Sequence, residues 1–204
     1  MMSPEEYVIM LIGSIIEMGL VCMLAYYLYG SRHDNVRRFD GSWNTRNIAL
    51  MIVFFGIAGV ISTHYFSFYV DGARINVKDF VALVSGFIGG PFVGIGSGAI
   101  IGVERFLQGG PTALPCALAP IIAGAVGGII WHFGKEKYPK IWVAAISMLV
   151  IEVIHVLMIN YISDPMSAGH NAASIMGFAI IDFNLLCVVA FSLIYRLGVN
   201  KANK

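Results

Sequence analysis

Six apolar stretches, each of roughly 20 residues, limit what this 204-residue chain can fold into. A helix of about 20 residues crosses the roughly 30 Å hydrocarbon core of a bilayer. The chain is also 58% hydrophobic and 12% charged, where a soluble domain carries about 25% charged residues. The sequence therefore predicts an all-α integral membrane protein, with apolar stretches at residues 7–29, 47–70, 80–103, 113–133, 141–162 and 172–195.

Composition and motifs exclude several function classes. A net charge of +1 provides no basic stripe for nucleic acid. The three cysteines lie far apart, without CxxC or metal-ligand spacing. The chain contains no P-loop, GxSxG or HExxH motif, so we predict neither an enzyme nor a cofactor. We expect one membrane domain over residues 1–204, with an additional N-terminal helix at 7–29 and a receptor core at 47–196.

The third stretch contains helix breakers at its centre, Gly89-Gly90-Pro91. If it folds back there as a re-entrant hairpin, 10 of the 13 Lys and Arg residues fall on one face of the membrane. If all six stretches crossed the membrane once, 5 of these residues would lie on one face and 8 on the other. The positive-inside rule favours the hairpin and a cytoplasmic C-terminus. Glycines recur every four residues between 86 and 102, and one kinked helix with a close-packed glycine face would also produce that spacing.

A hairpin would bring Lys78 and Arg105 together on the outward face, at its two feet. Thr112 and Cys116 follow at the start of the next predicted helix. Non-helical backbone at membrane depth persists only where protein or a water-filled cavity satisfies it, so a broken segment indicates a binding site.

Several segments resemble the LytS–YhcK-type five-transmembrane receptor family. They are Asn76-Val77-Lys78, GFIGGPFVG at 86–94, GVERFLQGGPTALPC at 102–116, and Gly124. The resemblance runs from about residue 47 to the end of the chain. It implies a sensory input domain of bacterial histidine kinases and diguanylate cyclases in the cell membrane, hence two-component signalling and cell wall regulation. Some members of the family respond to pyruvate. The broken-helix layout is more remotely similar to substrate-binding subunits of energy-coupling-factor vitamin transporters.

Two positions depart from the family pattern. Lys78 stands where the family usually has arginine, which keeps the charge but loses the planar geometry suited to carboxylates. Glu104 replaces a histidine before Arg105 and could neutralise that arginine.

We predict that a small carboxylate such as pyruvate binds between the two cations and the glycine-rich turn that follows them, where Gly109 and Gly110 leave backbone donors open. The predicted ligand-binding residues are Asn76, Lys78, Arg105, Gly109, Gly110, Thr112 and Cys116.

Each of these side chains also has a structural alternative. Arg105 could extend to the membrane interface, and Lys78 could be an interfacial anchor. Asn76 and Thr112 could cap the helices that follow them. Cys116 could line a pocket, report redox state reversibly or simply pack.

Four ionisable residues within the apolar stretches form a second candidate group, because such residues are costly in a membrane. They are Glu17, Glu152, His155 and Asp182. Glu152 and His155 share a helical face, as in carboxylate-bridged metal bundles. Such bundles need two copies of this motif and the chain has one, so we predict no metal. Proton or polar coupling and an interhelical hydrogen-bond network are the alternatives.

The predicted function is a membrane receptor that binds an extracytoplasmic carboxylate and relays to a cytoplasmic kinase or cyclase domain. A homodimer is expected, since such output domains work in pairs. The alternatives are a solute transporter or its substrate-binding subunit, and a structural membrane partner that docks through its glycine face.

Overall fold

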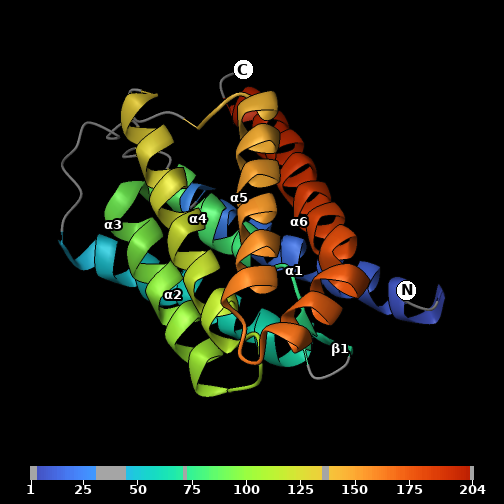
Figure 1. Cartoon of the computed structure of the whole chain (residues 1–204). Helices are drawn as coiled ribbons and strands as arrows, with labels where there is room; N and C mark the ends of the chain where they lie inside the picture. The colour runs from blue at the N-terminus through green and yellow to red at the C-terminus, as the bar shows by residue number, and fades with distance from the viewer. Residues whose placement is uncertain (1–3, 31–44, 71–72, 135–137, 203–204) are drawn as a thin grey trace.

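The computed structural model describes residues 4–30, 45–70, 73–134 and 138–202. Helices and two short strands account for most of these residues (Figure 1). In chain order the elements are α1 (Pro4–Gly30), α2 (Thr45–Tyr65), β1 (Phe68–Val70), β2 (Ala73–Ile75), α3 (Lys78–Leu107), α4 (Ala113–Phe133), α5 (Ile141–Ile162) and α6 (Met166–Ala202).

Five of the described helices, α2 to α6, are long and apolar enough to cross a membrane. They lie over the predicted stretches, with shifted ends, and confirm the all-α multi-pass class. The first predicted stretch forms α1, whose apolar part, Tyr7–Met23, is shorter. The connection at residues 31–44 carries several of the charges used to predict orientation and lies outside the described residues. Orientation therefore stays a prediction.

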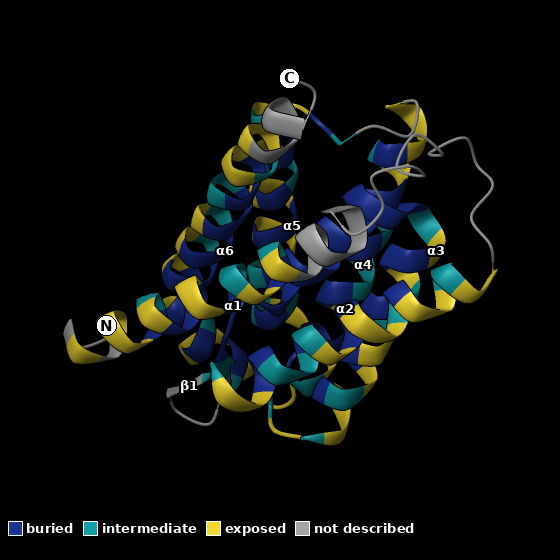
Figure 2. Ribbon diagram, turned by 180° about the vertical axis from the view of Figure 1, so that it is seen from behind, coloured by how far each residue is buried: buried dark blue, intermediate teal, exposed yellow. Residues whose placement is uncertain are grey.

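Helices α3 and α4 form one pair and α5 and α6 form another, and α1 and α2 lie behind these pairs. In Figure 1, α5 and α6 run side by side in opposite directions, and α3 and α4 pack together next to them. Figure 2 shows α1 and α2 on the opposite face, where α1 contacts both α6 and α2. The core lies between these layers and is densest around the first arm of α3.

Helix α3 is a hairpin rather than one continuous helix. Gly90 adopts φ 76° and ψ −172°, a conformation that requires glycine. The hydroxyl oxygens of Ser85 and Ser97 lie 2.6 Å apart. In an unbroken helix these residues would be separated by roughly 18 Å along the axis. The predicted fold-back at residues 89–91 is confirmed, and the continuous kinked helix is excluded.

The short β-hairpin before α3 was not predicted. β1 pairs with β2 in antiparallel register, with Phe68 opposite Ile75. The apolar stretch predicted to run to residue 70 ends its helix at Tyr65, and aromatic and β-branched residues then form the strand. This turn directs the chain into Asn76 and the start of α3.

Glycines allow α3 and α4 to approach at backbone distance. A Cβ added to Gly94 would lie 2.1 Å from the carbonyl oxygen of Gly124, and one on Gly98 would lie 2.4 Å from that of Pro120. Real side chains cannot occupy such positions unless the backbone moves. The glycine repeat is therefore the contact surface between both arms of the hairpin and α4.

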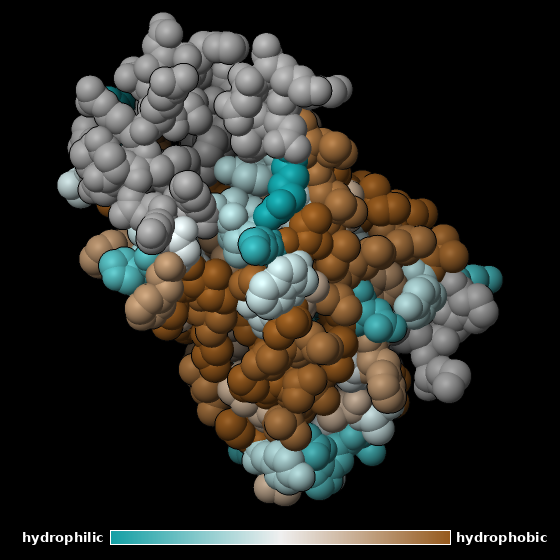
Figure 3. Space-filling model, turned by 90° about the horizontal axis from the view of Figure 1, so that it is seen from above, coloured by the Kyte–Doolittle hydropathy of each residue, from teal (hydrophilic) through white to brown (hydrophobic). Residues whose placement is uncertain are grey.

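The outer surface of the bundle is apolar. Large hydrophobic side chains such as Phe92, Phe133 and Phe178 are more than 70% exposed. Figure 3 shows apolar atoms over most of the described surface on one face, with polar atoms gathered in small groups. The polar side chains considered below lie instead inside the bundle, as expected when lipid is the surrounding solvent.

We predict that Gly94→Ala destabilises the protein by about 3 kcal/mol, because the new methyl group meets backbone that cannot rotate away. The free energy of unfolding in detergent micelles measures this loss. Gly19→Ala is the matched control, since nothing lies within 4 Å of a Cβ there and alanine favours the helix. Equal stability of the two variants would contradict the close contact between the hairpin and α4.

Candidate ligand-binding site

The hairpin brings its two cationic residues to one end of the bundle, where both are buried. Lys78 begins the first arm of α3 and Arg105 lies in the last turn of the second arm. Their exposed fractions are 2% and 1%. Both side chains are enclosed by protein, which argues against the interfacial alternatives. Burial of two cations in a membrane protein requires compensating partners.

Arg105 has only neutral partners among the described residues. Its Nη1 donates to the carbonyl oxygen of Gly109 at 2.9 Å, and its Nη2 donates to Oγ1 of Thr112 at 3.1 Å. Nε is buried and has no acceptor in the described part of the chain. No described carboxylate lies within 4.0 Å of the guanidinium. The positive charge of Arg105 is therefore solvated by dipoles but not paired.

Glu104 does not neutralise its neighbour, which corrects that expectation. Its Oε2 accepts a hydrogen bond from Oγ1 of Thr63 at 2.7 Å, and its Oε1 contacts His64 and Gln108. Successive residues on a helix point in different directions, so Glu104 faces α2 while Arg105 faces inward.

The turn after Arg105 presents an acceptor to the guanidinium, and one of its two predicted open donors is already used. Gly109 and Gly110 have φ of 70° and 90°, which L-residues rarely adopt. The N–H of Gly109 is already bonded to the carbonyl oxygen of Phe106 at 3.0 Å, so the prediction of an open donor at Gly109 is wrong. Thr112 makes no side-chain cap and instead orients Arg105 through its hydroxyl.

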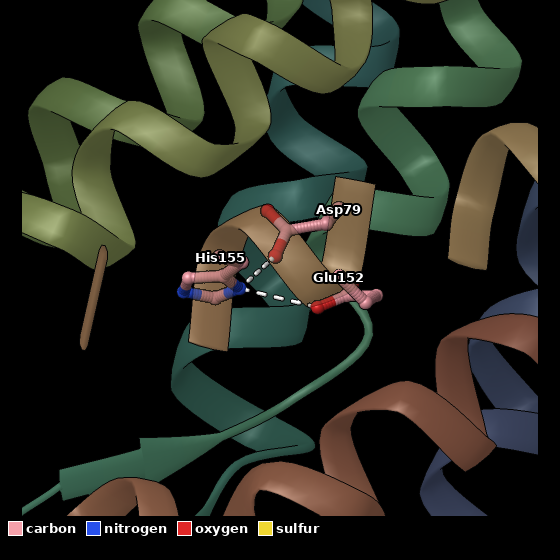
Figure 4. Close-up of side chains that lie close together, drawn as sticks. All are labelled: Asp79, Glu152 and His155. Carbon is pink, nitrogen blue, oxygen red and sulfur yellow. Dashed lines mark hydrogen bonds and ion pairs between the residues drawn. The ribbon is translucent and has the colours of Figure 1, made fainter. Parts of the chain in front are cut away.

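A network of buried ionisable side chains surrounds the first turn of α3 (Figure 4). The Nζ of Lys78 lies 3.5 Å from Oδ2 of Asp79. The same oxygen lies 2.9 Å from Nδ1 of His155, which is also 3.2 Å from Oε2 of Glu152. All four side chains are at most 2% exposed. Asp79 thus neutralises Lys78 and links α3 to α5, a role that the sequence analysis missed.

Cys116 continues this network into α4. Its Sγ lies 3.4 Å from Nε2 of His155, the ring nitrogen opposite the one that faces the carboxylates. Lys78 and Arg105 both act electrostatically on the thiol, so the site combines α3, α4 and α5. Of the predicted residues, the structure gathers Lys78, Arg105, Thr112 and Cys116 at one end of the bundle, together with Glu152 and His155.

The three residues drawn in Figure 4 also have the donor set of a metal site. One ligand atom from each of Asp79, Glu152 and His155 lies within 4.8 Å of the others. The Lys78 ammonium beside Asp79 already supplies a positive charge there. This cation compensates part of the negative charge of the carboxylates, and the absence of a metal stays a prediction.

The start of α3 is capped by a residue from α6. The amide oxygen of Asn184 accepts the N–H of Phe80 at 2.9 Å, and its nitrogen donates to the carbonyl of Asn76 at 3.3 Å. Asn76 also accepts the Lys78 N–H at 3.4 Å, in agreement with a capping role. Asn184 was missed, although it lies four residues from Ile180 and Val188 on the buried stripe of α6.

The two remaining predicted polar residues, Glu17 and Asp182, differ in burial. Glu17 of α1 is buried, its carboxylate oxygens have no hydrogen-bond partner among the described residues, and it interacts electrostatically with Lys78 and Asp79. Asp182 is exposed on α6, and the described residues offer it no hydrogen bond or ion pair. The expectation that Asp182 joins Glu152 and His155 is therefore wrong, because it lies off the buried stripe of its helix.

Fold and site together define a multi-pass membrane domain built around a buried polar centre beneath a re-entrant helical hairpin. The family described as 5TMR of 5TMR-LYT matches residues 36–197. The chain belongs to this five-transmembrane receptor family, and the resemblance noted in the sequence is confirmed. Helix α1 precedes the matched region.

Among curated proteins, the chain is similar to sensor proteins of two-component type. It is 26% identical over 185 residues to "Sensor protein LytS" of Bacillus subtilis. The aligned region covers 81% of this chain and 31% of the relative. It is 26% identical over 192 residues to "Sensor histidine kinase/phosphatase LytS" of Staphylococcus aureus, covering 85% and 32%. The chain thus spans about a third of the length of these relatives. No solved structure matches the chain.

We predict that Asn184→Ala destabilises the protein by about 2 kcal/mol, because a buried N–H of α3 and the Asn76 carbonyl each lose a partner. The unfolding free energy in micelles measures the change. Asn171→Ala, on an exposed position of the same helix, should stay within about 0.5 kcal/mol of the wild type. If Asn184→Ala were as stable as the wild type, this would show that α6 does not hold the start of α3.

Proposed function

We propose that this domain is the membrane-embedded input of a signal-transduction receptor and that it binds a small carboxylate, with pyruvate as the first candidate. The ligand carboxylate binds at Arg105, beside Lys78, the turn at residues 109–112 and Cys116. Family membership and the printed names of the sensor relatives support the receptor class. The chemistry of the ligand rests on the buried side chains.

The observation that carries the proposal is the unpaired charge of Arg105. The guanidinium is buried in an apolar bundle, has only neutral partners, and keeps one donor, Nε, without an acceptor. An unpaired buried charge is strongly unfavourable, whereas a guanidinium and a carboxylate form short, charge-assisted hydrogen bonds. An external carboxylate would supply the missing charge and the missing acceptor.

Lys78 contributes less to this binding than its charge suggests. Its ammonium already lies 3.5 Å from Asp79, so its field is partly cancelled. A lysine also lacks the bidentate geometry with which arginine holds carboxylates. We therefore assign Arg105 as the principal anion contact and Lys78 as a weaker one.

The signal passes through the contact between α3 and α6. Asn184 of α6 holds Phe80 and Asn76 at the foot of the hairpin, next to Lys78. A ligand that draws the hairpin toward α4 would change the position of α6, which leads to the C-terminus. We propose that the C-terminus is cytoplasmic, that α6 acts on a kinase or cyclase output domain, and that the receptor works as a homodimer. Ligand control follows only if the two conformations differ in affinity.

A thermal-stability assay with small carboxylates tests the ligand. A ligand that binds only the folded protein adds about 2.7 kcal/mol of stability at a hundredfold excess over its dissociation constant. We expect pyruvate or a related carboxylate to raise the melting temperature of the wild type in detergent, and Arg105→Ala to lose this shift while remaining folded. Arg196→Ala, an exposed arginine at the other end of the bundle, should keep it. No shift with any carboxylate would overturn the proposed ligand class.

Asp79→Asn should have the opposite effect on carboxylate affinity. Removing the Asp79 charge leaves Lys78 uncompensated, and the local potential becomes more positive. We expect the dissociation constant to fall roughly tenfold, which corresponds to about 1.4 kcal/mol. Isothermal titration of the purified variant measures the change. Weaker binding than the wild type would show that Asp79 contacts the ligand or shapes its site, contrary to our assignment.

A further inference from the structure

Cys116, His155 and Asp79 form a linear chain of three functional groups across three helices. The Sγ of Cys116 lies 3.4 Å from Nε2 of His155, and Nδ1 of the same ring lies 2.9 Å from Oδ2 of Asp79. Glu152 approaches Nδ1 from a second direction at 3.2 Å. A nucleophile, a base and a group that orients the base are the parts of an activated nucleophile.

The neighbours of His155 determine which ring nitrogen carries the proton. Nδ1 is hydrogen-bonded to Oε2 of Glu152 at 3.2 Å and lies 2.9 Å from Oδ2 of Asp79, so we assign the proton of the neutral ring to Nδ1. In the neutral ring the lone pair is then on Nε2 and points at the thiol of Cys116. This is the tautomer in which a histidine removes a proton from a nucleophile while a carboxylate stabilises the resulting imidazolium.

The surroundings of Cys116 place positive charge near its sulfur. The residue lies in the first turn of α4, close to the positive end of the helix dipole. Lys78 and Arg105 add positive charge on the side of α3. Thiolates are favoured at helix N-termini and beside cationic side chains.

Cys187 shows that burial alone does not create these surroundings. Cys116 and Cys187 have the same exposed fraction of 2%. Cys187 lies in the middle of α6, and the only hydrogen bond of its Sγ among the described residues is to the carbonyl oxygen of Ser14, at 3.7 Å. The protein therefore contains two equally buried cysteines, of which Cys116 has a histidine nitrogen beside its sulfur and Cys187 does not.

A buried donor with no acceptor among the described residues lies at the same end of the bundle as Cys116. The Nε of Arg105 is a buried donor without an acceptor in the described residues, and its guanidinium acts on the Cys116 sulfur. An oxygen attached to that sulfur would carry partial or full negative charge. The free donor would supply a charge-assisted hydrogen bond to it.

We propose that Cys116 is a nucleophilic thiol that undergoes reversible oxidation by hydroperoxides, with His155 as its base and Asp79 as the residue that positions the base. The thiolate sulfur attacks one oxygen of hydrogen peroxide and the O–O bond breaks. Cys116 becomes a sulfenic acid, and the departing hydroxide takes the proton of the imidazolium to form water. The sulfur is oxidised by two electrons and the peroxide is reduced by two. Thiols reverse this step by forming and then exchanging a disulfide.

The reactivity of Cys116 is independent of the proposed carboxylate ligand and is measured without it. Oxidation would change Cys116, one of the residues beside which the proposed function places the carboxylate. The receptor would then have a covalent input next to its binding site. Failure of the thiol chemistry leaves the carboxylate assay unchanged, and failure of the carboxylate assay leaves the thiol chemistry unchanged.

The experiment compares the two buried cysteines within one molecule. Full-length wild-type protein in detergent is treated with methyl methanethiosulfonate, a small neutral reagent that transfers its methylthio group to a thiolate and releases methanesulfinate. Site-resolved mass spectrometry gives the rate at each cysteine. A free thiol is a few per cent thiolate at pH 7. We therefore expect Cys116 to react on the order of tenfold faster than Cys187, and equal rates would overturn the proposal.

Variants show whether Cys116 reacts faster because His155 activates its thiol or because the reagent reaches it more easily. His155→Gln should lower the Cys116 rate about tenfold at pH 7 and make it rise more steeply with pH than the wild-type rate. Asp79→Asn should also slow Cys116, since the imidazolium that forms then loses the neighbouring carboxylate that stabilises it. His132→Gln, an exposed histidine on α4, is the matched control and should change nothing. A fast Cys116 in His155→Gln would show that access alone sets the rate.

The oxidation itself is tested with hydrogen peroxide and dimedone, which traps sulfenic acid. We expect dimedone to label Cys116 in the wild type, with little label on Cys187 and at least a severalfold loss in His155→Gln. Addition of dithiothreitol before dimedone should remove the label. A wild-type protein with a rapidly alkylated Cys116 but no peroxide-dependent label would overturn the oxidation step. Equal labelling of both cysteines would overturn the role of His155.

Discussion

The fold-back of α3 at Gly90 is the constraint on which the polar centre depends. If residues 78 to 105 formed one straight helix, Lys78 and Arg105 would lie roughly 40 Å apart, near opposite surfaces of the membrane. The turn places both at one end of the bundle, where Thr112 and Cys116 of the next segment follow directly. Close contact with α4 at glycine positions holds the two arms together, so the site is assembled by backbone packing rather than by the charges themselves.

The two buried cations are compensated unequally. Asp79 lies between Lys78 and His155 and compensates both, while Glu152 approaches the same histidine. Arg105 receives no comparable partner from the described residues, although it is equally buried. Because the desolvation of a lone guanidinium is costly, this asymmetry is informative. It separates Lys78, which is compensated within the bundle, from Arg105, to which our proposal assigns the ligand.

Local patterns were sufficient to predict part of this arrangement. Breakers at 89–91 together with charge bias predicted the hairpin, and the hairpin placed Arg105 near the next helix. The partners of Asp79 and Asn184 could not be predicted, since both contact residues from helices distant in the chain. Asp182 was grouped with the buried residues because it lies in an apolar stretch, but the stretch does not reveal which side of α6 faces lipid.

The helix that would carry a signal outward is joined to the site by one side chain of defined geometry. Asn184 bonds the first turn of α3, next to Lys78 and Asp79. In our proposal a carboxylate at Arg105 would add negative charge to this region, whereas oxidation of Cys116 would replace a thiolate and an imidazolium by a neutral sulfenic acid and a neutral imidazole. Two chemically different inputs would then alter the same electrostatic balance, and α6 would respond to their sum rather than to either one alone.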